Sequence, residues 1–246
     1  MIERKMDSLC DAARNPRTYM RQSGLHPRIH SKNLDRTFGY KIPKIEQKLT
    51  QKYRSYYQCP DESNKKKHYS GTQTWIGLHP QALQTTYNDI FEALYIIQEH
   101  NIDKIVDIGA GYGRVGLVMS SLFPEARFIG FEILKQRQQE GNRVFEKLKL
   151  VNCEILLENV LEEKFILPQA QVYFIYDFSE AEDICKILDE LVSRIEEYNF
   201  FLITKGDLVD YLLEKKYKQF WQTNGYLSSG EIKIYSSNTD LKAMKN

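Results

Sequence analysis

Apolar residues along positions 85–236 follow two spacings that alternate with each other. Ile90, Leu94 and Ile97 recur as on one face of a helix, and Thr85 or Thr86 can cap the start of that helix. Between segments of this kind lie short apolar runs typical of buried strands. The pattern predicts strands at 104–108, 127–132, 153–158, 171–178 and 199–204, and helices at 85–100, 115–123, 135–150 and 181–197.

Two segments near the end of the chain are predicted to close the sheet. Residues 217–222 and 231–237 stand on either side of a turn region at 224–230, as in an antiparallel pair. Strands that alternate with helices form a parallel sheet with helices on both faces. We therefore expect an α/β, Rossmann-like fold with a seven-stranded, mostly parallel sheet and a C-terminal antiparallel hairpin.

The first seventy residues differ from the rest in pattern and in charge. They show no sustained period and contain several proline-centred breaks, so we expect irregular or locally helical structure. They carry 16 Lys and Arg against 7 Asp and Glu, whereas the remaining residues carry 18 against 26. This contrast predicts a basic N-terminal extension, residues 1–70, before a domain of residues 71–246.

Within this extension, residues 51–58 and 64–70 interleave cations with tyrosines. Such a segment can follow a phosphate backbone while its rings stack on bases, which makes a nucleic-acid partner possible. The alternative is a solvated basic segment that packs against the acidic surface of the domain.

Composition adds three expectations. A chain of 246 residues with 42% apolar and 12% aromatic residues can bury a core of one large domain. The first ten residues have no apolar signal region and no apolar run exceeds five residues, so we expect a cytoplasmic protein without a membrane partner. Cys10, Cys59, Cys153 and Cys185 form no C-x-x-C pair and have no histidine at ligand spacing, so we expect no metal site.

A glycine-rich turn, VDIGAGYGRVG at 106–116, follows the first predicted strand. In open α/β sheets, ligands bind at the carboxyl ends of the strands, where the strand order reverses. The turn contains G-x-G-x-x-G, and Glu132 lies 21 residues after Gly111, which fits a nicotinamide dinucleotide. A tight turn with no ligand is the structural alternative.

Asp107 argues against the dinucleotide. A carboxylate at the end of the strand would repel an anionic pyrophosphate, but it would attract the sulfonium and ammonium of S-adenosylmethionine. The arrangement D-x-G-x-G-x-G, with Asp107, Gly109, Gly111 and Gly113, therefore favours the methyl donor as cofactor. Glu132, at the end of the second strand, can accept hydrogen bonds from two ribose hydroxyls.

These residues carry a resemblance to a known family. VDIGAGYGR followed by ARFIGFEI resembles motifs I and II of the class I, seven-strand methyltransferases, and the resemblance covers about residues 84–236. It implies glycines close to the methionine part of the cofactor, an aspartate that orients the turn, a ribose-binding glutamate and a residue near the adenine. The implied cofactor site consists of Asp107, Gly109, Ala110, Gly111, Gly113, Glu132 and Asn159.

The fourth predicted strand is where this family places the acceptor. FIYDFSEAEDICKIL loosely resembles the non-SET protein-lysine methyltransferases, which implies Tyr176 and Asp177 as the catalytic pair. A lysine must lose its proton before it attacks the methyl group, and a carboxylate near a desolvating pocket can assist. Trp75, Tyr112 and Phe178 are candidates for an aromatic wall with Tyr176.

The leading hypothesis is therefore transfer of a methyl group to a protein side chain, with lysine favoured. The alternatives are an RNA or small-molecule acceptor, or an inactive cofactor-binding adaptor. The sequence lacks an N/D-P-P-Y motif and a Pro-Cys pair, which many base-modifying enzymes carry.

Overall fold

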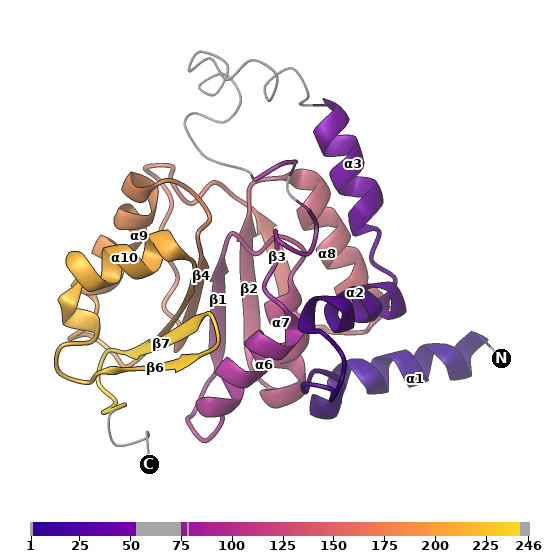
Figure 1. The fold of residues 1–246 in the computed structure, drawn as a ribbon, viewed down its shortest axis with the longest axis horizontal. Helices are drawn as coiled ribbons and strands as arrows, with labels where there is room; N and C mark the ends of the chain where they lie inside the picture. Colours follow the sequence, from indigo (N-terminus) through magenta and orange to yellow (C-terminus); the bar gives the residue numbers. More distant parts are fainter. Residues whose placement is uncertain (1, 53–74, 78, 242–246) are drawn as a thin grey trace.

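The structure of the protein, a computed structural model, describes residues 2–52, 75–77 and 79–241 (Figure 1). Seven strands of these described residues form one sheet in the order β3-β2-β1-β4-β5-β7-β6. Strands β1 to β5 are parallel, whereas β7 is antiparallel to both of its neighbours. The strands are β1 Lys104–Ile108, β2 Arg127–Glu132, β3 Cys153–Leu157, β4 Val172–Tyr176, β5 Phe201–Lys205, β6 Tyr226–Ser229 and β7 Ile232–Ser236. The predicted Rossmann-like sheet is confirmed.

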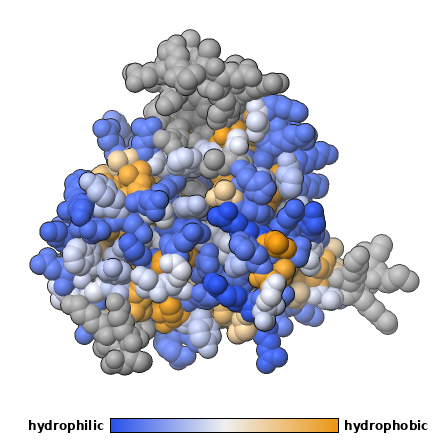
Figure 2. Space-filling model, viewed as in Figure 1, coloured by the Kyte–Doolittle hydropathy of each residue, from blue (hydrophilic) through white to orange (hydrophobic). Residues whose placement is uncertain are grey.

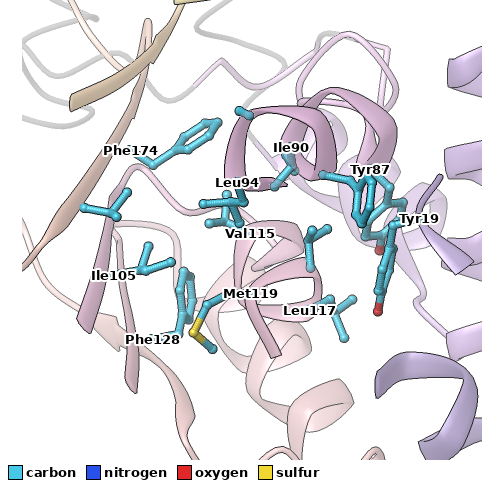
Figure 3. Packing of buried hydrophobic residues seen from close by; sticks show 14 of the residues in the cluster. Tyr19, Tyr87, Ile90, Leu94, Ile105, Val115, Leu117, Met119, Phe128 and Phe174 are labelled. Carbon is cyan, nitrogen blue, oxygen red and sulfur yellow. The ribbon is translucent and has the colours of Figure 1, made fainter. Parts of the chain in front are cut away.

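Helices cover both faces of the sheet and divide the core into two layers. One layer contains buried residues of α6, α7 and α8, and the other contains those of α9 and α10. Figure 3 shows the first layer, where Leu94 and Val115 pack between the helices and Ile105, Phe128 and Phe174 come from the strands. The helices are α1 Ile2–Arg14, α2 Pro27–Phe38, α3 Ile42–Lys52, α6 Tyr87–Ile96, α7 Arg114–Leu122, α8 Lys135–Lys147, α9 Ala181–Ser193 and α10 Asp207–Lys215. No helix of the described residues is long and apolar enough to cross a membrane.

The end of the chain differs from the prediction in two ways. Residues 217–222 do not form a strand: Lys218–Phe220 is a single 3-10 turn that buries Phe220, and the Trp221 indole N–H donates to the Leu213 carbonyl at 3.0 Å. The first strand of the hairpin is instead β6, inside the predicted turn region, and Gly230 with φ of +59° begins the two-residue connection to β7. Helix α10 was not predicted.

The described part of the first seventy residues is more regular than predicted. It contains the helices α1, α2 and α3, and two of its aromatic side chains, Tyr19 and Phe38, are fully buried beside Tyr87 of α6. Polar residues occupy much of the buried surface of α2, so this helix has few apolar positions. Its pattern of apolar residues therefore shows only a weak helical period in the sequence. The boundary predicted at residue 70, and most of the two tyrosine-rich basic segments, lie outside the described residues.

Two buried ion pairs join these helices to the rest of the protein. Arg114, the first residue of α7, pairs with Asp35 of α2 and also donates to the Thr85 carbonyl at 2.9 Å. Arg137 of α8 pairs with Glu46 of α3, with N···O distances of 2.9 and 3.1 Å. Because each charge lies away from water, each depends on its partner.

Removing one partner of a buried pair should therefore be costly. Asp35→Asn leaves the Arg114 guanidinium buried without a compensating charge, and we expect the free energy of unfolding in urea to fall by about 3–5 kcal/mol. The exposed pair Arg127–Glu154 offers a matched control, since Glu154→Gln should cost less than about 1 kcal/mol. Equal losses in the two variants would contradict this prediction.

Candidate cofactor and acceptor site

A cavity lies at the carboxyl ends of β1, β2 and β4, where the strand order reverses on either side of β1. The turn after β1, the end of β2, the segments that follow β3 and β4, and residues 82–83 line it. The parallel register places the ends of these strands at one edge of the sheet, so residues far apart in the chain meet there.

The glycine turn follows β1 with its backbone at the cavity. Gly109 has φ of +77° and Gly111 has φ of +57°, a conformation that favours glycine, and both line the cavity. The amides of Gly109 and Ala110 donate to the Phe131 carbonyl at the end of β2, at 3.0 and 2.9 Å. A Cβ added at Gly109 would stand 2.8 Å from the Cβ of Phe178, so only glycine fits between the turn and the segment after β4.

Two residues of the predicted cofactor site have packing contacts instead of lining the cavity. The Ala110 methyl lies against Gly130 of β2. A Cβ added at Gly113, which caps α7 with φ of +80°, would meet Phe145 at 2.5 Å and Ile155 at 2.9 Å. Gly113 therefore permits close packing of α7 against α8 and β3.

Glu132, at the end of β2, holds the turn in place from inside the cavity. Its carboxylate accepts hydrogen bonds from the Gly111 amide at 2.9 Å and from the Leu134 amide at 2.8 Å. Burial raises the pKa of Glu132, while the nearby Arg137 charge and the two amide donors act in the opposite direction. The carboxylate is thus fixed in orientation and borders the cavity.

Asp107, which is buried and does not line the cavity, and Asn159, which does, both keep hydrogen-bonding capacity. No described residue donates a hydrogen bond to the Asp107 carboxylate, and burial, with the charge of Glu132 second, raises its pKa to about 8. Asn159 lines the cavity, and its Oδ1 accepts from the Leu161 amide at 3.1 Å. This leaves the amide NH2 of Asn159 as the donor for a ligand. The residues present therefore fit a cationic ligand that carries hydroxyl and base groups.

The two predicted catalytic residues, Tyr176 and Asp177, also line the cavity. The Tyr176 hydroxyl donates to the Ala82 carbonyl at 3.2 Å. The Asp177 carboxylate accepts from the amides of Leu208 and Val209, at 3.1 and 2.8 Å, and so caps the start of α10. Asp177 thus has a structural function that the sequence did not indicate, and its catalytic role stays a prediction.

The aromatic candidates separate into two groups. Trp75 and Phe178 line the cavity together with Tyr176, whereas Tyr112 is fully buried and donates to Glu46 at 2.6 Å. Arg137 also lines the cavity, and sequence reasoning missed it. No local signal identifies it, because its partner Glu46 lies 91 positions earlier in the chain.

The contact at Gly109 allows a test of the cavity as the cofactor site. Gly109→Ala forces the turn or Phe178 to shift, and we expect its affinity for S-adenosylhomocysteine, measured by calorimetry, to fall at least about tenfold. Gly24→Ala is the matched control, because Gly24 has φ of +76° with nothing within 4 Å of an added Cβ. The control should lose stability by about 1–2 kcal/mol but keep its affinity. Unchanged affinity in Gly109→Ala would contradict the assignment.

The raised pKa of Asp107 predicts a pH dependence of stability. The folded state holds the Asp107 proton up to a pKa of about 8, whereas the unfolded chain releases it near pH 4, so this group lowers stability progressively as pH rises between these values. Asp107→Asn removes the effect. We expect the difference in free energy of unfolding, variant minus wild type, to increase by on the order of 3 kcal/mol between pH 5 and pH 8. Parallel pH profiles in urea unfolding would contradict this.

Comparison with known proteins agrees with the geometry. A family model described as "Putative methyltransferase" matches residues 102–179. The ribosomal RNA small subunit methyltransferase G of Mycoplasma mycoides is 31% identical over 131 residues, which are 50% of this chain and 87% of that protein. The protein of the same name from Mycoplasma capricolum is 29% identical over 176 residues, 68% of this chain and 69% of that protein.

Among solved structures, an RNA methyltransferase from Salinibacter ruber in complex with S-adenosyl-L-homocysteine matches this chain at 15% identity and a TM-score of 0.44. The match covers 62% of this chain and 91% of the other chain. A similarity of this size carries no argument about the chemistry of the chain. The assignment to a family rests instead on three observations: the strand order, the glycine turn with its two acids, and the 31% identical relative. This chain belongs to the class I S-adenosylmethionine-dependent methyltransferases.

Proposed function

We propose that this protein transfers a methyl group from S-adenosylmethionine to ribosomal RNA. The observation that carries the proposal is the identity with two proteins named ribosomal RNA small subunit methyltransferase G, one of them matched over 87% of its length. The lysine hypothesis has no comparable support, since it depended on a loose likeness around Tyr176 and Asp177. RNA, one of the alternative acceptors, is therefore the acceptor that we now favour.

We assign the cofactor to the side of the cavity that Glu132 borders. In this assignment the Glu132 carboxylate, held by the Gly111 and Leu134 amides, would accept from ribose hydroxyls, the Asn159 amide would donate to the adenine, and the buried Asp107 would attract the positive charge of the methionine part. Gly109 and Gly111 let the backbone approach the ligand closely. The cofactor supplies the electrophilic methyl group, and the protein supplies position and charge.

The acceptor would enter beside the aromatic residues after β4. Tyr176 and Phe178 border the cavity, and Trp75, with 38% of its surface exposed, lies at the same cavity. Aromatic rings stack on unpaired bases with about 1–3 kcal/mol per base and without regard to sequence. Because its hydroxyl donates to the Ala82 carbonyl, the Tyr176 ring has a fixed place at this wall.

The test is methyl transfer from radiolabelled S-adenosylmethionine to three separate acceptors: deproteinised small-subunit ribosomal RNA, intact small subunits and the extracted ribosomal proteins. We expect label in the RNA fraction that ribonuclease removes and protease does not. Gly109→Ala should reduce the label in parallel with its lower cofactor affinity.

Label confined to a protease-sensitive fraction would overturn the proposal in favour of a protein acceptor. Label in none of the three fractions, from a protein that binds S-adenosylhomocysteine, would also contradict it.

A further inference from the structure

Helix α2 has two faces of opposite character. Its buried residues, which include His30, Ser31 and Phe38, pack towards α6 and the core. Its exposed residues include three cations and no acid: Arg28, Ile29, Lys32, Asn33, Arg36 and Thr37. Asp35 is the single acidic residue in the helix, and it faces inward to Arg114. The outer face therefore carries three cations and no acid of its own, and the Arg28 charge also acts on the Glu231 carboxylate between β6 and β7.

The three cations form a regular stripe. Arg28, Lys32 and Arg36 are four residues apart, so they lie on one side of the helix and span about 12 Å along its axis. None of them forms an ion pair with a described residue, although many other cations of the protein do. Asn33 adds a side-chain amide next to the stripe, whereas the Thr37 hydroxyl donates to the Asn33 carbonyl at 3.0 Å.

The stripe lies close to the cavity along a short chain of contacts. Gln81 donates to the Asp35 carboxylate at 3.2 Å from the inner side of α2. The next residue, Ala82, lines the cavity and accepts the hydrogen bond of Tyr176. Figure 1 shows α2 beside α7, and Figure 2 shows hydrophilic side chains around a small hydrophobic patch on this part of the surface. Arg28, at the start of the stripe, is near enough to the cavity for its charge to act on the Tyr176 hydroxyl in the direction that lowers its pKa, so a polymer that reaches into the cavity can also contact this end of α2.

We propose that Arg28, Lys32 and Arg36 bind phosphates of the RNA backbone next to the acceptor nucleotide. This inference rests on the proposed function. Cations at even spacing, with the Asn33 amide between two of them, fit a chain of phosphates and sugars, which such groups contact independently of sequence. Phosphates repeat regularly along an RNA strand, whereas the carboxylates of an acidic protein surface do not. The even spacing of the three cations therefore favours RNA as the partner.

The experiment measures how salt weakens the binding of RNA to the full chain. The probe is a fluorescein-labelled single-stranded RNA of 20 nucleotides and mixed sequence, and its affinity is measured between 50 and 200 mM salt. For single strands, the logarithm of the affinity falls with the logarithm of the salt concentration by about 0.7 for each phosphate contact. The triple variant R28Q/K32Q/R36Q should therefore have a slope about 2 smaller in magnitude than the wild type.

The control variant K215Q/K216Q/K218Q makes the same change of charge around the end of α10, away from α2 in Figure 1. It should keep the wild-type slope. Both variants should bind S-adenosylhomocysteine as the wild type does, which shows that the fold and the cofactor site are intact.

Equal slopes for the two variants would overturn the inference about α2. That result would leave the proposed function untouched, because the radiolabel in ribosomal RNA tests it separately with the wild-type protein. A slope that falls only in the α2 variant supports the inference. In that case the variant should also need more ribosomal RNA to reach half-maximal labelling, with little change in the maximal rate.

Discussion

The hydrogen bond from the Gly111 amide to the Glu132 carboxylate is the contact on which the site depends. It joins the turn after β1 to the end of β2, and the same carboxylate accepts the Leu134 amide before α8 begins. One buried side chain thus sets the relative position of two neighbouring strand ends and of the cavity between them. Only glycine can follow this path at position 109, because Phe178 closes the other side.

Among the described residues, the charge around this contact is not balanced. Asp107, Glu132 and Glu46 are buried close to the turn, and Arg137 is the cation that pairs with Glu46 and partly compensates Glu132. The raised pKa values of Asp107 and Glu132 both express the cost of burying carboxylates there. A ligand with a positive charge lowers that cost. The electrostatics of the free protein therefore favour S-adenosylmethionine over an anionic dinucleotide, the choice that Asp107 indicated in the sequence.

Local signals in the sequence were enough for strands β1 to β5 and β7, and they brought Gly109, Gly111, Glu132 and Asn159 to notice, which all line the cavity. The apolar runs at 104–108 and 127–132 coincide with β1 and β2, and Thr86 caps α6 through the Asp89 amide. Contacts between distant positions were not accessible in this way. Nothing near Arg114 indicates Asp35, 79 residues earlier, and nothing near Asp177 indicates that its carboxylate caps a helix at Leu208. Gly113 carried the family motif, but the side chains that crowd it belong to α8 and β3.

The N-terminal helices show why a count of charges was an incomplete guide. The charge counts suggested that cations of the extension pack against acidic residues of the domain. The two buried pairs have the opposite polarity, since Asp35 and Glu46 come from the extension and the arginines come from the domain. The acidic residues of α2 and α3 thus form buried ion pairs, whereas the cations of the same helices face outward. The outer surface of α2 is therefore more positive than its composition alone implies, and the helix both anchors Arg114 and presents charge beside the cavity.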